Sequence, residues 1–208
     1  MSIIYSEPFE AYTTGSALTA NPPNFVTTAS NGTWTVESGF GSNSAANLTT
    51  VNWSHAMFNG ASYTYTDLTV RCKQGARATI FTRVTALSGV NSIPTDGYQL
   101  QSFPAMLTLY RGGYAVSLGT WAFDPANVND FQMRLLCNGN QISAYIDGVL
   151  RIGPVTDATY ASGKVGFGTF GGTTSRWDDI TVDDGVAVDT ISTGGGTMMS
   201  RRAVRRRK

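Results

Sequence analysis

The stretch FQMRLLCNGNQISAYIDGVLRI, from Phe131 to Ile152, carries the clearest structural pattern in this 208-residue chain. Apolar and polar residues alternate on both sides of Asn138-Gly139, and a second pair of this kind, Asp147-Gly148, comes before the last four residues. Asx-Gly pairs between alternating segments are the strongest short-range signal of a β-hairpin. We therefore expect two successive hairpins. One core face is expected to hold Phe131, Met133, Leu135, Cys137, Ile142, Ala144 and Ile146.

The same alternation extends outward from this stretch, from about residue 34 to residue 182. It predicts strands at 63–72, 77–85, 97–103, 105–110, 114–121, 164–170 and 176–182, and Arg111-Gly112-Gly113 indicates a further hairpin turn. No segment shows the pattern of an amphipathic helix. Roughly a dozen short antiparallel strands with frequent turns indicate an all-β protein, an antiparallel β-sandwich of the jelly-roll type.

The charge distribution divides the chain into two parts. Lys and Arg number 15 and Asp and Glu 14, a formal net charge of +1. Six basic residues lie in the last eight positions: Arg201, Arg202, Arg205, Arg206, Arg207 and Lys208. The first 200 residues are therefore acidic, and the STGGGT stretch before the basic cluster has the composition of a flexible linker. We expect one β-sandwich domain over residues 1–190, followed over 191–208 by a Gly linker and a flexible polybasic C-terminal arm.

Two further features bear on the protein's environment. No apolar run approaches the roughly 18 residues of a membrane helix, and the start of the chain lacks the pattern of a cleaved signal, so we expect synthesis in the cytoplasm without a signal peptide. Cys72 and Cys137 both end alternating apolar patterns. Two buried free thiols are the favoured interpretation, and a disulfide between them remains an open alternative.

The segment from Phe131 to Asp184 resembles the concanavalin A-like lectin/glucanase superfamily, in its laminin G-like branch. The resemblance rests on Tyr145-Ile146-Asp147-Gly148, on the spacing of Asp, Tyr and Gly over Asp157–Gly166, and on the final strand Trp177–Val182. It implies a concanavalin A-like jelly roll. It does not imply one function, because that family includes lectins, adhesion domains, polysaccharide hydrolases and viral surface proteins, and function depends on the site rather than the fold.

Catalytic residues of that family are missing. Its hydrolases carry Glu-x-Asp-x-Glu on one strand, whereas this chain has three Glu, at positions 7, 10 and 37, none in such a motif. His55 is the only histidine and has no nucleophile motif near it. We therefore expect no enzymatic activity and no cofactor. A structural calcium ion is the one alternative kept open, because Asp178, Asp179 and Glu10 would meet if the terminal strands pair.

A sugar-binding surface needs aromatic platforms beside hydrogen-bonding groups. The candidates on the polar side of the predicted strands are Tyr98, Tyr110, Tyr114 and Trp121. Each has an alternative interpretation as a core aromatic residue, which is the commoner role of aromatic residues in strands.

The leading functional hypothesis is a non-enzymatic surface-display protein of a large assembly, such as a phage capsid decoration or fibre-type protein at the virion surface. Its basic arm would bind other copies of the chain and an acidic scaffold protein such as a capsid, since Arg-rich arms seek acidic partners. The sandwich would face surface glycans, and nucleic acid would bind through the arm if at all, because the acidic body repels phosphate. The alternatives are a free-standing carbohydrate-binding lectin and, third, a polysaccharide hydrolase.

Overall fold

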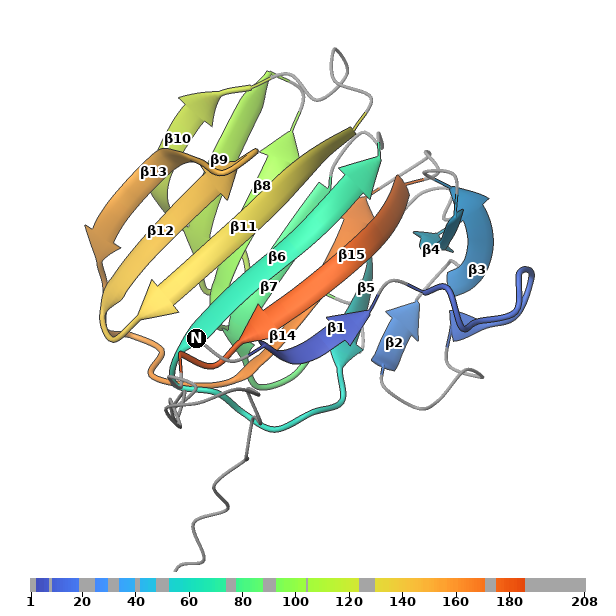
Figure 1. Ribbon diagram of the computed structural model, residues 1–208. Helices are drawn as coiled ribbons and strands as arrows, with labels where there is room; N and C mark the ends of the chain where they lie inside the picture. Colours follow the sequence, from blue (N-terminus) through green and yellow to red (C-terminus); the bar gives the residue numbers. More distant parts are fainter. Residues whose placement is uncertain are drawn as a thin grey trace, which may run out of the picture.

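The computed structural model describes residues 3–7, 9–18, 25–29, 34–39, 42–47, 53–73, 78–87, 93–103, 105–123, 130–170 and 175–185. The predicted linker and basic arm, residues 191–208, lie outside this range. Within it the chain folds as two antiparallel sheets packed face to face (Figure 1). None of the described segments forms a helix long and apolar enough to cross a membrane.

Eight strands form the first sheet. Their order is β13 (Val149–Thr156), β12 (Gln141–Ile146), β11 (Asp130–Asn138), β6 (Thr66–Lys73), β15 (Ser175–Asp183), β4 (Ser42–Asn47) and β3 (Trp34–Gly39), with β1 (Ile3–Glu7) paired to β15. Figure 1 shows β13, β12, β11, β6 and β15 side by side in the nearer layer.

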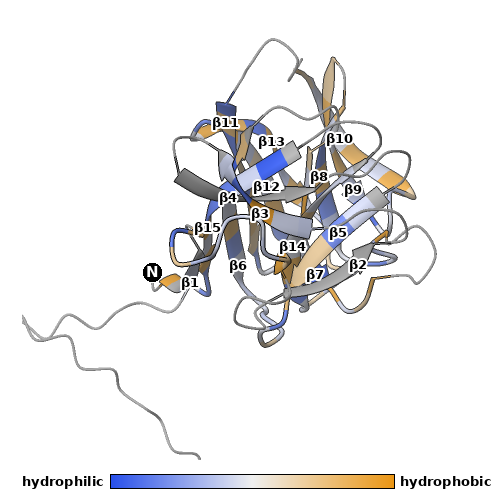
Figure 2. Ribbon diagram, turned by 90° about the vertical axis from the view of Figure 1, so that its right-hand side faces the viewer, coloured by the Kyte–Doolittle hydropathy of each residue, from blue (hydrophilic) through white to orange (hydrophobic). Residues whose placement is uncertain are grey.

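Seven strands form the second sheet. Their order is β10 (Val116–Ala122), β9 (Met106–Arg111), β8 (Tyr98–Phe103), β7 (Ala78–Val84), β14 (Lys164–Phe170), β5 (Trp53–Phe58) and β2 (Phe25–Ala29). Figure 2 shows the two layers from the side, with β6, β11 and β15 in one and β7, β8 and β9 in the other. The predicted antiparallel β-sandwich is confirmed.

The core lies between the sheets and includes a group of aromatic side chains. The rings of Trp34 and Trp177 from the first sheet lie 5.1 Å apart, and Phe167 from the second sheet lies 5.3 Å from Trp34. All three side chains are buried. A fully buried side chain of this size contributes roughly 1.5–3 kcal/mol or more by leaving water. This group therefore packs the final strand, β15 of the first sheet, against the second sheet.

The hairpins predicted from Phe131 to Ile152 are confirmed, with one shift in position. The second turn is Asp147-Gly148, where both residues have positive φ, 50° and 74°. The first turn consists of Gly139 and Asn140, because Asn138 is already paired with Gln141. Glycine suits this position because φ at Gly139 is +58°.

The two cysteines lie on neighbouring strands but far apart along them. Cys72 on β6 pairs with Phe131, while Cys137 on β11 pairs with Thr66. Six residues of extended strand span roughly 20 Å, far beyond the reach of a disulfide. Both cysteines are free and buried. The interpretation as buried thiols is confirmed, and the disulfide alternative is excluded by the strand register.

Strand β7 is buried on both sides. Every residue from Ala78 to Val84 is buried, although alternation alone would leave half of them facing solvent. The same holds for β8 from Tyr98 to Ser102. The side of the seven-stranded sheet that faces away from the core is therefore covered along its middle strands.

Candidate functional site

The seven-stranded sheet has a second face, which we call the outer face. Ala56, Ile80 and Leu109 of β5, β7 and β9 belong to the core cluster. Since side chains alternate along a strand, their immediate neighbours point away from the core. The side chains of the outer face include those of His55, Met57, Thr79, Phe81, Gln99, Gln101, Thr108, Tyr110, Ser117 and Thr120.

Strand register arranges these side chains in two parallel rows. His55 pairs with Gly168, Gly168 with Thr79 and Thr79 with Gln101, and the row continues through Thr108 and Thr120. Every side chain in this first row is polar. The second row, two residues along each strand and three along the bulged strand β10, consists of Met57, Gly166, Phe81, Gln99, Tyr110 and Ser117. The outer face thus carries a polar row beside a partly aromatic one.

The two glutamines of β8 hold polar atoms that no described residue satisfies. The Gln99 side chain is fully buried, and its Nε2 donates to the Asp96 carbonyl oxygen at 2.5 Å, while its Oε1 has no partner among the described residues. Gln101 is 4% exposed, and its Nε2 also has no hydrogen-bond partner within the described part of the chain. A buried unsatisfied amide costs roughly 1–3 kcal/mol. The outer face therefore holds one buried acceptor and one buried donor on β8 that lack a partner among the described residues.

Two tyrosines lie at the β9–β10 end of the outer face. The rings of Tyr110 and Tyr114 meet edge to face at 5.3 Å. Tyr114 sits in the turn after β9 with φ +69°, and its hydroxyl lies 3.5 Å from Nε2 of His55. Burial raises the pKa of the Tyr114 hydroxyl above its ordinary value. Tyr114 therefore extends from the turn over the middle of the sheet and covers part of the polar row.

Gly168 makes room for this arrangement. A Cβ at position 168 would lie 2.2 Å from Cδ2 of His55. The imidazole of His55 therefore lies over the bare backbone of β14, and its ring contacts Phe81 at 5.7 Å between centroids. A side chain at position 168 would force His55 out of reach of Tyr114.

The structure does not place Tyr98 and Trp121 on the polar side where the sequence suggested them. Tyr98 is fully buried in the core, and its hydroxyl donates to Oδ1 of Asp157 at 2.8 Å. Burial, with the hydrogen bond to Asp157, raises its pKa to about 12. Trp121 packs on the core side, stacked on Phe123 at 5.5 Å, and Arg151 lies over its ring at 4.2 Å. Of the four aromatic candidates, the structure brings together Tyr110 and Tyr114.

Sequence reasoning missed the amide and hydroxyl groups beside these tyrosines. The signal was present in the segment YQLQS, where Gln99 and Gln101 alternate with residues of the core. Two glutamines on one face of a strand read as a solvated surface, and that interpretation draws no attention to them. The two glutamines become candidate ligand-binding residues because they are buried, and the sequence pattern alone does not predict that burial.

Among the described residues, the three carboxylates considered for calcium do not form a metal-binding group. Asp178, Asp179 and Glu10 do not come together, and no group of three His, Cys, Asp or Glu side chains among the described residues is placed to hold a metal ion. Asp178 instead accepts a hydrogen bond from the backbone N–H of Asp179 at 2.8 Å. The Asp179 carboxylate lies 3.6 Å from the guanidinium of Arg71. These carboxylates are engaged within the eight-stranded sheet.

Comparisons with known proteins identify the fold. No family model matches the sequence, and no curated protein gives a significant match. Among solved structures, the carbohydrate-binding module CBM66 from Bacillus subtilis is similar at 15% identity, over 77% of this chain and 95% of that module, with a TM-score of 0.61. The exoplasmic/lumenal domain of VIP36, in its form bound to Ca²⁺ and Man3GlcNAc, is similar at 11% identity, over 81% of this chain and 86% of that domain, with a TM-score of 0.60.

A prokaryotic β-1,3-1,4-glucanase (lichenase) derived from a mouse hindgut metagenome is also similar, at 13% identity, over 86% of this chain and 98% of that chain, with a TM-score of 0.56. At these identities the similarity shows the fold alone. That fold is the concanavalin A-like jelly roll, as the sequence resemblance implied.

Proposed function

We propose that this chain is a non-enzymatic, carbohydrate-binding protein of lectin type, and that it holds neutral glycans on the outer face. The observation that carries the proposal is the row of uncharged hydroxyl and amide side chains beside the tyrosine pair. Gln101, Thr108 and Thr120 lie in register on three adjacent strands. Tyr110 lies one row away and contacts Tyr114.

The chemistry of these groups suits a sugar. Hydroxyl and amide groups both donate and accept, as sugar hydroxyls do, so they form paired hydrogen bonds without placing a charge in the site. Tyrosine rings add apolar contact with the C–H faces of a pyranose or furanose ring while keeping a polar end. A ligand hydroxyl that accepts a hydrogen bond from Gln101 Nε2 would also satisfy this buried donor, and that hydrogen bond would stabilise the complex. A neutral glycan has the hydroxyls for this and no charge to desolvate.

The absence of a carboxylate pair on this face supports a non-enzymatic role. Glycoside hydrolysis needs two carboxyl groups flanking the scissile bond, about 5–10 Å apart. The described side chains of the outer face include neither Asp nor Glu. Glu37, on β3 of the other sheet, faces the guanidinium of Arg176 at 3.3 Å. The lichenase similarity concerns the fold, which is shared between binding proteins and enzymes.

A glycan array of neutral oligosaccharides tests the proposal. We expect the wild-type protein to bind a restricted set of neutral glycans, and Tyr110→Ala to lose that binding. Tyr145→Ala is the matched control, because Tyr145 is a half-buried tyrosine on β12 of the other sheet. An array without signal for the folded wild-type protein, or equal signals for both variants, would overturn the proposal.

A second candidate role is display of this sandwich on a large assembly such as a virion surface, and the observation that favours it is the charge of the arm. Six of the 15 basic residues fall within eight positions next to a Gly-rich stretch. Such a cluster attracts an acidic surface, for example a capsid protein, with copies of this chain arrayed beside each other. Deleting residues 192–208 should then abolish incorporation into the particle while thermal unfolding of the sandwich stays unchanged. Normal incorporation of the truncated chain would rule this role out.

A further inference from the structure

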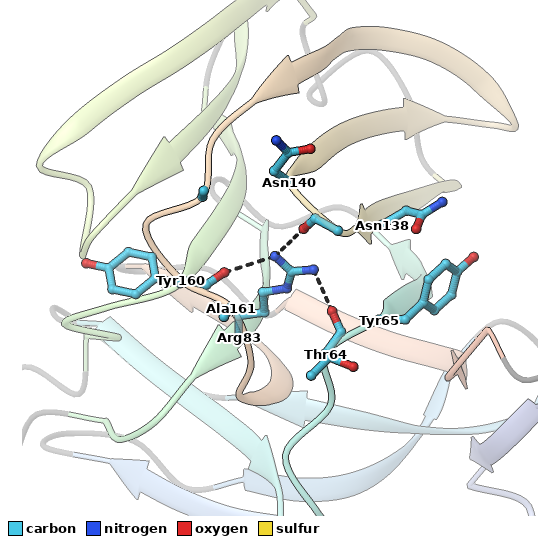
Figure 3. A pocket seen from close by; sticks show the side chains of 9 residues that line it. Thr64, Tyr65, Arg83, Asn138, Asn140, Tyr160 and Ala161 are labelled. Carbon is cyan, nitrogen blue, oxygen red and sulfur yellow. Dashed lines mark hydrogen bonds between the residues drawn. The ribbon is translucent and has the colours of Figure 1, made fainter.

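A cavity of about 470 Å³ opens at the end of the sandwich where β11 turns into β12 (Figure 3). Its lining comes from three loops and the ends of β7 and β11, and consists of Thr64, Tyr65, Arg83, Asn138, Gly139, Asn140, Ala158, Tyr160 and Ala161. None of these residues belongs to the outer face. The lining contains one cation and no acidic residue.

The cation, Arg83, is almost fully buried and held in an unusual backbone conformation. It is 1% exposed, with φ at +56°, a region that non-glycine residues seldom occupy. Its Nη1 donates to the carbonyl oxygens of Gly139 at 2.8 Å and Tyr160 at 2.9 Å. Its Nη2 donates to the carbonyl oxygen of Thr64 at 2.5 Å. Figure 3 shows these three hydrogen bonds converging on the guanidinium from three different loops.

No carboxylate neutralises this buried charge within the described part of the chain. The ion pairs recorded there do not include Arg83. The buried carboxylates of Asp157 and Asp67 are each paired with another arginine, at 2.7 Å in both cases. The Arg83 Nε has no hydrogen-bond partner among the described residues. A buried charge is costly unless it is paired, so a positive potential remains at this end of the sandwich.

The three peptide groups that accept hydrogen bonds from Arg83 extend this positive potential into the cavity. In a trans peptide the C=O and the following N–H point in opposite directions. Three carbonyls turn their oxygens to the guanidinium, so the N–H groups of the next residues, Tyr65, Asn140 and Ala161, point away from it. All three of those residues line the cavity. None of the three N–H groups donates to another described residue. Several backbone N–H groups turned outward together form an anion-binding concavity.

We propose that this cavity is an oxyanion site, which takes the carboxylate or phosphate group of a small ligand on the N–H groups of Tyr65, Asn140 and Ala161. Arg83 supplies the charge from behind the three peptides, and its carbonyl partners fix their direction. The side-chain amides of Asn138 and Asn140 offer further donors at the rim. The cavity volume is within the range of small-molecule sites, roughly 300–1,000 Å³. A single uronic acid residue and inorganic phosphate are two sources of this chemistry.

The test is a titration of the ¹⁵N-labelled full chain with glucuronate, with inorganic phosphate and with glucose as the neutral match of glucuronate. We expect glucuronate, phosphate or both to shift the backbone amide signals of Tyr65, Asn140 and Ala161, and glucose to leave them unchanged. Which anion acts identifies the source. Raising the salt concentration should weaken the effect, because screening reduces the attraction between exposed charges.

A variant pair separates the site from general charge effects. Asn140→Asp places a negative charge at the rim while keeping the acceptor for Gln141 Nε2, and should weaken anion binding at least about tenfold by repulsion. Gln132→Glu makes the same change of charge on an exposed side chain of β11, eight positions before Asn140, and should leave binding unchanged. Arg83→Met should lose binding and stability together. Amide signals that do not respond to either anion, or equal binding by the first two variants, would overturn the proposal. Neutral-glycan binding on the outer face is independent of either result.

Discussion

Replacing Gln101 by leucine should stabilise the protein and abolish glycan binding at the same time. Gln101 is 4% exposed, and its Nε2 lacks a hydrogen-bond partner among the described residues. The folded chain therefore keeps a desolvated donor on the outer face. Leucine has a similar volume and no polar atom, so it removes that cost.

The size of the effect follows from two opposing contributions. Removing an unsatisfied buried amide group gains roughly 1–3 kcal/mol, and the change of shape costs up to about 1.5 kcal/mol. We expect a net gain of about 1 kcal/mol in the free energy of unfolding, which corresponds to a rise of roughly 2–4 °C in Tm for a chain of this length. Urea unfolding monitored by tryptophan fluorescence measures it. Gln132→Leu, on the exposed side of β11, is the control and should change stability by less than about 0.5 kcal/mol.

A loss of more than about 1 kcal/mol in Gln101→Leu would refute this reasoning. It would mean that Nε2 of Gln101 has a strong partner in the free protein. The amide would then be a structural group and would not be held ready for a ligand. Unchanged glycan binding by the stabilised variant would lead to the same conclusion from the functional side.

Three further predictions follow from contacts outside the polar row. Trp121→Ala should cost about 2–3 kcal/mol of stability, because Trp121 packs on the core side, yet should leave array binding unchanged; a loss of glycan binding at full stability would place the ligand at Trp121 instead. Burial alone would raise the pKa of Asp157, but hydrogen bonds from Thr159, Tyr98 and Arg111 hold it at about 2 against an ordinary 3.8, so about 2 kcal/mol of stability is present above pH 4 and is lost as the pH falls toward 2. Urea midpoints of wild type and Asp157→Asn across that range should converge, and parallel curves would contradict the assignment. Burial raises the pKa of both Cys72 and Cys137, so Ellman's reagent should find no reactive thiol in the native protein and two after unfolding, whereas a native reaction would show that one of them is accessible.

The sheets were predictable because their signals are local. Alternation and Asx-Gly pairs placed the hairpins around Cys137, and the turn moved by a single residue, to Gly139-Asn140. Binary patterning specifies which face of a strand is buried, and that choice decides the sandwich. The register that separates the two cysteines came from the pairing of β6 with β11, which links segments about 60 residues apart. Patterns within one strand do not fix such pairings.

The site was less predictable, and Trp121 shows why. Continuous alternation along β10 would put Ser117, Gly119 and Trp121 on the same side. The structure has a register shift between Ser117 and Gly119, so Ser117 pairs with outer-face Tyr110 while Trp121 pairs with core residue Leu107. One extra residue in a strand turns every later side chain to the other face. No residue type in this part of the sequence predicts the β-bulge.

Burial of the outer face was likewise hidden from the pattern. Thr79, Gln99 and Gln101 have the polar character of solvated positions, and the structure buries all three. Their significance depends on Tyr114, which reaches over the sheet from a turn to His55. A contact between residues about 60 positions apart is a property of the tertiary structure. The buried charge of Arg83 is of the same kind, because its three carbonyl partners come from three loops.

The central claim is that the outer face binds a neutral glycan, and the side-chain amide signals of the glutamines test it most directly. The measurement is a ¹H–¹⁵N spectrum of the full chain titrated with neutral oligosaccharides of glucose, galactose, mannose and fructose. The account predicts that at least one of these sugars shifts the Nε2 signals of Gln99 and Gln101 and leaves those of Gln132 and Gln141, on the other sheet, unchanged. Unchanged Gln99 and Gln101 signals with every sugar, or shifts confined to the other two glutamines, would contradict it.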